Sequence, residues 1–249
     1  MAEVKIFLTV SDSSPWEVPA DFDPDNNTVE CVGAGAGGYN DGIVASGGGG
    51  AGAYSKKSNL ALSGSINFVV PAGGQNSFSA TDTHTDFNDG EVTAECGLPS
   101  TGLTGGLGGL ASNSVGTVKK NGGNGGNSTD GSQAGSGGGA GGNINNGDPG
   151  GDDEGYGGGN GEDPQVPGSE GSFAGADGQP GICFDASHGT GSGAGAGTSV
   201  SGSGGQYGGG AGGWNIIDGQ SGIGGNGLIV ITYEPLVSVN NPRGFFAVL

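Results

Sequence analysis

Glycine recurs at every third position in short runs along the middle of this sequence, and this spacing limits the folds open to the chain. One such run is Gly135, Gly138 and Gly141, and the phase of the runs resets about every ten residues between residues 97 and 227. An extended left-handed helix has three residues per turn, with its backbone N–H and C=O groups pointing outward. Because glycine has no Cβ, such helices can lie side by side and hydrogen-bond to one another. The spacing therefore predicts a packed bundle of short polyglycine II helices.

The composition supplies little material for a conventional core, since 64 of the 249 residues are glycine and only 31% are hydrophobic. A folded chain of this kind must be held mostly by backbone hydrogen bonds. Collagen is excluded, because the glycine triplets are interrupted and the chain has only 11 prolines. A disordered low-complexity spacer is the alternative. The β segments that bracket the glycine runs favour an ordered scaffold.

Short β-strands are predicted on both sides of the glycine runs. Residues 4–10 alternate apolar and other side chains with a period of two, and a turn cluster follows. Further strands are expected over residues 28–32, 53–60, 65–70 and 91–96. The most hydrophobic segment, residues 228–233, is a candidate buried strand that can pair with the N-terminal strands. No stretch has the 3.6-residue apolar period of an amphipathic helix.

These elements predict a mostly β and irregular fold with almost no α-helix. A β-strand frame from the N- and C-terminal segments is expected to enclose a packed sandwich of polyglycine II helices. The predicted segments are an N-terminal β-strand frame with glycine loops over residues 1–96, a polyglycine II region over residues 97–227, a closing β-strand over residues 228–235 and a C-terminal docking tail over residues 236–249.

The charge balance argues against nucleic acid and membranes as partners. The net charge is -19 with only six basic residues, so phosphate backbones and anionic membrane surfaces repel the chain. No run of about twenty apolar residues is present, and no membrane insertion is predicted. The N-terminal MAEVKIFLTV has no small-residue cleavage site. We interpret it as a strand and not a signal peptide, and expect the product to stay in the cytoplasm until something else releases it.

Two motif-like glycine segments resemble ligand sites without the context that those sites need. Gly33–Gly38 satisfies G-x-G-x-x-G after a predicted strand, but the glycine-rich sequence that follows cannot begin a stable helix, so no nucleotide cofactor is predicted. Gly158–Asp163 fits the opening of a calcium-binding nonapeptide, but no second copy stands beside it. The acidic residues nearby are interpreted as a solvated loop, with a calcium site as the alternative. They are Asp152, Asp153, Glu154, Glu162 and Asp163.

The cysteines and histidines lack the spacing of a metal or catalytic site. Cys31, Cys96 and Cys183 are too far apart for a metal ribbon or redox motif, and are interpreted as small residues in strands or tight packing. His84 and His188 have no partner at the spacing of a nucleophile–base pair. No paired carboxylates lie in the apolar surroundings that a glycosidase needs. We therefore predict no catalytic residue, no cofactor and no metal, and a protein that is not an enzyme.

Five aromatic residues interrupt the glycine region, and two interpretations apply to them. They can plug the space between helix layers, or stand on loop tips and stack on a sugar or a surface protein. Trp214 precedes two isoleucines, which favours burial. The candidates for external contact are Tyr156, Phe173, Phe184 and Tyr207.

The C-terminal tail carries apolar residues that are costly to expose. It ends in Phe245-Phe246-Ala247-Val248-Leu249. We expect Phe245, Phe246 and Leu249 to dock onto a partner, with an extra strand on this domain as the alternative.

An ordered series of motifs resembles the glycine-rich domain of bacteriophage tail-fibre and adhesin-like proteins. The series is W-x-V-P at Trp16–Pro19, a strand that runs into glycine at residues 28–38, Y-S-K-K at Tyr54–Lys57, and G-x-I-V-I-T-Y at Gly227–Tyr233. Together these motifs cover both ends of nearly the whole chain. The resemblance implies a β frame that carries polyglycine II helices, whose distal loops contact a host receptor. The chain lacks the separate attachment domain of longer tip adhesins, which leaves its place on the particle open.

The resemblance makes a virion structural protein the first expectation, assembled in the host cytoplasm and acting as a tail-fibre or tail-tip adhesin. Its expected partners are other virion proteins and a host cell-surface glycan or protein, and a homo-oligomer stays open. The alternative is a capsid decoration or head-fibre display protein without a single receptor. A third hypothesis, a secreted or cell-wall glycine-rich protein, conflicts with the absence of a signal sequence.

Overall fold

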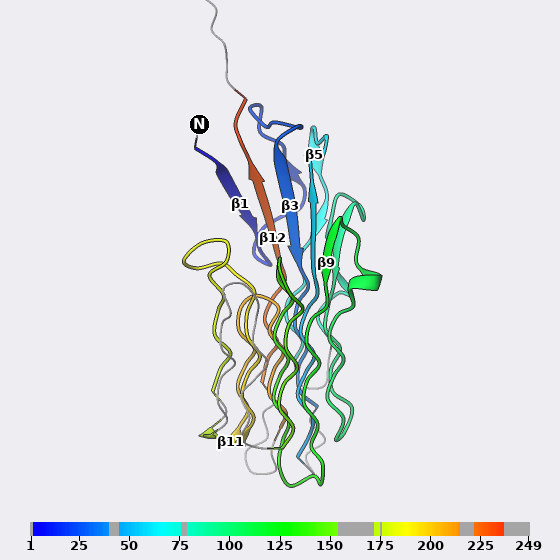
Figure 1. Cartoon of the computed structure of the whole chain (residues 1–249), viewed down its shortest axis with the longest axis vertical. Coiled ribbons are helices and arrows are strands. Elements are labelled where there is room, and N and C mark those ends of the chain that lie inside the picture. Colours follow the sequence, from blue (N-terminus) through cyan, green and yellow to red (C-terminus); the bar gives the residue numbers. More distant parts are fainter. Residues whose placement is uncertain are drawn as a thin grey trace, which may run out of the picture.

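The computed structural model describes residues 2–39, 45–75, 79–153, 172–174, 176–214 and 222–236, with the backbone alone at 172–174 and 197–200. The chain forms an elongated body with β-sheets at one end and extended glycine-rich segments at the other (Figure 1). Strands β3 (Asn27–Val32) and β12 (Leu228–Tyr233) lead directly into or out of glycine helices. The β-sheets and the glycine helices are therefore stacked end to end, and some chain segments run from one into the other.

A five-stranded antiparallel sheet forms the centre of the β end. Its order is β1-β12-β3-β4-β9, so the C-terminal strand β12 lies between two strands from the N-terminal part, as its apolar sequence predicts. The other members are β1 (Val4–Leu8), β4 (Tyr54–Ser58) and β9 (Val118–Lys120). Strand β9 was not predicted, because its Val-Lys-Lys sequence is too short to show a period of two.

A second, three-stranded sheet covers one face of the first. It contains β6 (Phe68–Val69), β7 (His84–Phe87) and β8 (Val92–Glu95). Strands β2 (Trp16–Glu17) and β5 (Ser65–Ile66) form a short pair beside it. Alternate residues of each strand point into the space between the sheets. The resulting core includes Val29, Cys31, Phe87, Val92, Ile229 and Ile231, all fully buried.

The glycine segments form a hydrogen-bonded bundle with a strict period of three. In the segment 45–53, successive N–H groups donate to three different neighbours in rotation. One set of N–H groups donates to residues 123–131, from Ala45, Gly48 and Ala51. A second set donates to residues 208–214, from Ser46, Gly49 and Gly52. The third set donates to residues 95–102, from Gly47, Gly50 and Ala53. Its carbonyls accept from residues 33–36, 106–109 and 135–141. Six described segments thus surround one helix, which is the packing expected of polyglycine II and confirms the interpretation of the spacing.

Close approach between these helices explains why so many positions are glycine. A Cβ placed on Gly52 would lie 1.8 Å from the carbonyl oxygen of Gly33, and one placed on Gly49 would lie 2.2 Å from that of Ala36. No side chain can tolerate such distances from backbone atoms. Alanine and serine occur in the same helix where the neighbouring backbone leaves room, as at Ser46 and Ala51.

Asparagine side chains close part of the bundle surface. Asn121, Asn124 and Asn127 also follow a period of three. Their side-chain oxygens accept hydrogen bonds from N–H groups of the neighbouring helix, at Ala111, Gly108 and Gly105, over 2.7 to 2.9 Å. Their own carbonyls accept from a further helix on the other side. At this edge the amide side chains supply the acceptors that another helix would otherwise provide.

The arrangement confirms a mostly β and irregular fold, with one 3-10 turn, η1 (Ala111–Asn113), as the only helix among the described residues. None of the described helices is of a length and apolarity that would traverse a bilayer. The predicted segments interleave in space: residues 33–39 and 45–53, expected as glycine loops of an N-terminal frame, are helices of the bundle. Strand β9, from the predicted glycine region, belongs to the central sheet. The β end caps the bundle instead of enclosing it (Figure 1).

Candidate functional site

The end of the bundle remote from the sheets is formed by chain reversals. Two described examples are the turns at residues 101–104 and 128–133. In the first, Thr101 and Thr104 exchange both backbone hydrogen bonds around Gly102, whose φ of +60° suits glycine. In the second, the hydroxyl and N–H of Ser132 hydrogen-bond to the Asp130 carboxylate and lower its pKa. These are ordered polar tips held by a rigid bundle.

Two of the predicted contact residues belong to parts of the chain about which the structure says little. Tyr156 lies outside the described residues. Phe173 lies in strand β10 (Ser172–Ala174), where only the backbone is described. Strand β10 pairs in parallel with β11 (Gly197–Val200), which lies at the remote end of the bundle in Figure 1. The docking residues Phe245, Phe246 and Leu249 also lie outside the described residues.

The other two predicted contact residues lie at the junction between the bundle and the central sheet. Tyr207 is 8% exposed and packs with Val32, Leu228 and Val230, so it cannot serve as a receptor-contact residue. Phe184 is half-buried against the same cluster, and its carbonyl accepts a hydrogen bond from Lys5 Nζ at 3.1 Å. Both residues therefore fill the space between the end of the bundle and the central sheet. The sequence could not show this, because reversals at the two ends of a helix bundle have the same composition.

The junction is further closed by a histidine. The ring of His188 stacks on Phe7 with a centroid distance of 3.8 Å, and on Tyr207 at 5.8 Å. Asp185 accepts hydrogen bonds from the N–H of Ser187 and from the N–H and Nδ1 of His188, and these bonds lower the pKa of Asp185. The loop that carries Phe184 and His188 is thereby fixed against the edge strand β1. His188 has a structural role.

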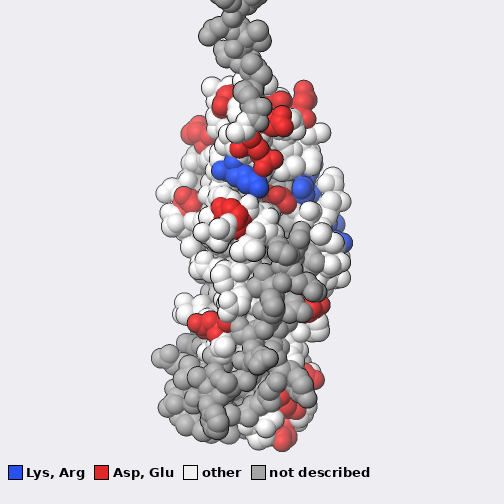
Figure 2. All heavy atoms as spheres, turned by 60° about the vertical axis from the view of Figure 1, so that its left-hand side comes forward, with Lys and Arg blue, Asp and Glu red and all other residues white. Residues whose placement is uncertain are grey.

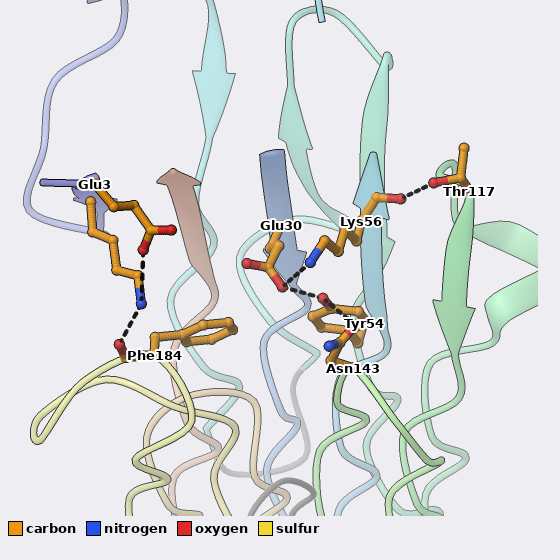
Figure 3. A network of polar contacts seen from close by, with 8 residues as sticks. Glu3, Glu30, Tyr54, Lys56, Thr117, Asn143 and Phe184 are labelled. Carbon is orange, nitrogen blue, oxygen red and sulfur yellow. Dashed lines mark hydrogen bonds and ion pairs between the residues drawn. The ribbon is translucent and has the colours of Figure 1, made fainter. Parts of the chain in front are cut away.

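A polar network lies on the open face of the central sheet (Figure 3). Tyr54 is buried, and its hydroxyl donates to the carboxylate of Glu30, which is also buried. Lys56 Nζ lies 3.7 Å from the same Glu30 oxygen. The Tyr54 hydroxyl also lies 3.4 Å from Asn143 Oδ1, in the loop that joins two glycine helices. Burial and the Glu30 charge raise the pKa of Tyr54 above its usual range. This network was not predicted from the sequence, although Glu30 and Lys56 both lie within predicted strands.

Above this network the sheet face forms a shallow polar groove of about 280 Å³. Its charged residues are Glu3, Lys5, Glu30, Lys56 and Glu234. Each lysine is paired with a carboxylate, at 3.6 Å for Lys5 and Glu3 and at 3.7 Å for Lys56 and Glu30. The groove can exchange hydrogen bonds with a hydroxylated molecule, but its lysines are already neutralised and do not form an anion site.

Charge is distributed unequally between the two ends. Five of the six basic residues of the chain lie on strands β1, β4 and β9 of the central sheet. Figure 2 shows basic side chains on the β end of one face and acidic side chains on both ends. The sequence from residue 121 to residue 227 contains eleven acidic residues and no basic residue. The described part of the bundle exposes Asp130, Asp148, Asp152 and Asp177, and its surface is therefore negative.

The remaining motif-like residues have structural roles where they are described. Residues 33–38 continue β3 as a glycine helix, with Gly33 and Ala36 donating to residues 53 and 50, so the G-x-G-x-x-G sequence forms no nucleotide loop. Asp152 and Asp153 accept hydrogen bonds from N–H groups at residues 127 and 129, which ties their carboxylates to a neighbouring helix. Glu154, Glu162 and Asp163 lie outside the described residues. Among the described side chains, no three His, Cys, Asp or Glu residues gather as a metal site would require.

The predicted packing roles of Cys31, Cys96 and Trp214 are confirmed. Cys31 and Cys96 are buried in or beside strands, and Trp214 is 3% exposed. His84 lies with Nε2 3.2 Å from the carbonyl oxygen of Asn113 and Nδ1 3.0 Å from the Thr83 hydroxyl, and so connects β7 to the 3-10 turn. The His84 contacts stabilise the β end.

Comparison with known protein families gives a match over most of the chain. A family model described as a glycine-rich domain matches residues 9–234, a range that covers the described bundle and every described strand except β1. No curated protein matches the sequence. The match extends over most of the chain, and the protein belongs to the glycine-rich domain family.

Proposed function

We propose that this chain is a structural protein of a bacteriophage particle, and that it acts as a tail-fibre or tail-tip adhesin that binds the host cell surface. The observation that supports this proposal is the saturated hydrogen bonding of the bundle, in which one helix exchanges bonds with six neighbours. Such a body resists bending and holds its chain reversals in fixed positions at the end away from the sheets. A recognition surface on loops needs a rigid support of this kind.

The distal loops are the proposed contact surface, and we propose Tyr156 and Phe173 as contact residues. A large planar side chain on a loop gives contact area at low entropic cost. The acidic bundle disfavours a strongly anionic receptor, because like charges repel. We therefore propose a neutral glycan or a surface protein as the host component.

The opposite end is the proposed attachment point to other virion proteins. The last described residue, Leu236, lies at the β end, where its N–H donates to the carbonyl of Asp21 at 2.7 Å. The tail that follows contains Phe245, Phe246 and Leu249. In this proposal the tail docks onto the particle, assembly takes place in the host cytoplasm, and the bundle points outward. No catalytic step is proposed.

Labelling of intact particles with an antibody against the chain tests the location. Label at the tail tip supports the adhesin, whereas label on the head supports the alternative of a capsid decoration or head-fibre display protein. Particles without label contradict both proposals.

Competition for adsorption tests receptor binding. Purified protein added to host cells before the phage should block adsorption, and the Tyr156→Ala variant should block it less. Ile144→Ala is a suitable control, because Ile144 is 55% exposed but belongs to the loop next to Asn143 at the β end. Equal blocking by wild type, Tyr156→Ala and Ile144→Ala would exclude Tyr156 from the contact surface, and no blocking by wild type would contradict the adhesin.

A further inference from the structure

Two neighbouring surface helices expose four leucine side chains. Leu98 lies on one helix and Leu107 and Leu110 on the next, with Leu103 in the turn between them. The helices are adjacent, since the N–H of Leu98 donates to the carbonyl of Leu107 at 2.8 Å. The four side chains are between 38% and 56% exposed. We call this surface, formed by Leu98, Leu103, Leu107 and Leu110, the leucine face. The chain segment that carries it, residues 98–110, runs along one edge of the body, at the right in Figure 1.

The bundle fixes the direction of the leucine face. With three residues per turn, Leu107 and Leu110 lie one above the other, roughly 9 Å apart along the helix. The glycines that precede them, Gly106 and Gly109, donate to the carbonyls of Gly48 and Ala51 in the interior. These inward bonds prevent the helix from rotating. The leucines therefore stay exposed unless another molecule covers them.

The leucine face combines exposed apolar side chains with an absence of charge. The 22 residues from Gly97 to Val118 contain no charged residue, in a chain with a net charge of -19. They contain five of the eleven large hydrophobic residues that are exposed among the described residues. At the border, the Glu95 carboxylate accepts hydrogen bonds from the N–H of Leu110 and the side chain of Asn113. The row of Asn121, Asn124 and Asn127 flanks the face with uncharged amides.

We propose that the leucine face binds the leucine face of a second copy of this chain. Two molecules of charge -19 repel each other, and contact through an uncharged edge keeps their carboxylates away from the interface. Both copies offer the same apolar row beside the same amide row, as a two-fold symmetric interface requires. The backbone of the face is already fixed by the bundle, so binding costs little further ordering. This inference is independent of what the distal loops bind.

Sedimentation equilibrium of the purified chain over about a hundredfold range of concentration tests the proposal. The wild type should associate, and association should strengthen as salt rises, because salt screens the repulsion between the acidic bodies. A wild type that stays monomeric at every concentration and salt level overturns the proposal.

A pair of matched variants tests the surface. Leu107→Gln with Leu110→Gln should weaken association by at least about tenfold, since each copy loses two apolar contacts. Ile144→Gln with Ile182→Gln is the control, because these residues are 55% and 54% exposed outside the leucine face. Thermal denaturation of each variant checks that the fold is retained. Equal association of both double variants, with the fold retained, overturns the assignment of the leucine face.

Discussion

The hydroxyl of Tyr54 donates a hydrogen bond to the carboxylate of Glu30 across two neighbouring strands of the central sheet, and both side chains are buried. Tyr54 lies where the sheet meets the glycine bundle and pairs with Val32, and Glu30 lies two register positions further up the sheet. The Glu30 carboxylate has Lys56 as its second partner, at 3.7 Å. This pair therefore supports the β end at the junction with the bundle.

Removal of the Tyr54 hydroxyl should destabilise the fold. The Tyr54→Phe variant leaves a buried carboxylate without its neutral donor, and we expect a loss of about 1 to 3 kcal/mol in the free energy of unfolding. Tyr233→Phe is the control, because the Tyr233 hydroxyl is 3.4 Å from Asp21, an exposed residue, and its loss should cost less than about 0.5 kcal/mol. Denaturant unfolding measures the free energy of unfolding of both variants. Equal losses would show that the Tyr54–Glu30 hydrogen bond stabilises the fold no more than the Tyr233–Asp21 contact does.

Alkaline pH should destabilise the wild type more than the Tyr54→Phe variant. Burial, followed by the charge of Glu30, raises the pKa of Tyr54 above the value of about 10 in an unfolded chain. The native state therefore keeps a proton that the unfolded state releases, and this part of the stability is lost as pH rises above about 10. Unfolding free energies measured from pH 8 upward should fall more steeply for wild type. Parallel curves would contradict the assignment to Tyr54.

Alanine in the centre of the bundle should disrupt it. A Cβ at Gly49 would meet the carbonyl oxygen of Ala36 at 2.2 Å, so Gly49→Ala must force two helices apart. We expect a loss of about 2 kcal/mol or more in the free energy of unfolding. The reverse change in the same helix, Ala51→Gly, should cost only about 1 kcal/mol, through added freedom of the unfolded chain. Thermal denaturation compares the two, and a Gly49→Ala variant as stable as Ala51→Gly would contradict the close packing.

The asparagine row can be tested at Asn124, whose side-chain oxygen accepts from the N–H of Gly108 at 2.8 Å. Asn124→Leu removes the acceptor and should cost about 1 kcal/mol. Asn124→Asp keeps an oxygen at this position and should retain most of the stability. Amide hydrogen exchange gives a local measure, since Gly108 should lose protection in Asn124→Leu and keep it in Asn124→Asp. Faster exchange in both variants would show that the bond is unimportant.

Thiol modification should separate the three cysteines. Burial raises the pKa of Cys31 well above its usual range and that of Cys96 to about 12, so neither forms a thiolate near pH 8. Cys183 is half-buried in the junction loop. A native-state reaction with a thiol reagent should modify Cys183 alone, and all three after denaturation. The Cys183→Ser variant should not react when folded; reaction at Cys31 or Cys96 would contradict their burial.

The sequence predicted the glycine helices because their cause is local. A three-residue helical turn and the absence of Cβ appear directly as glycine at every third position, and Gly135, Gly138 and Gly141 lie in a helix of the bundle. The strand at Leu228–Tyr233 was also predictable, since a fully buried strand needs an unbroken apolar run. The asparagine row carries the same period of three as the glycines, and that signal could have been recognised.

The ends of the bundle were not predictable, since a reversal near the sheets and a reversal at the distal end have the same polar and glycine-rich composition. In the structure, Phe184 and Tyr207 pack against Phe7, Val32 and Val230, which are distant from them in sequence. This burial makes them packing residues and not contact residues.

The sequence by itself thus determined the kind of helix and the buried closing strand, because both depend on backbone geometry and local polarity. Only the tertiary structure decided which helices are neighbours, which aromatic residues seal the junction, and that Leu98 joins Leu107 and Leu110 on one exposed face. These relationships depend on hydrogen bonds between segments that are distant in the chain, and a local sequence pattern does not specify which distant segments pair.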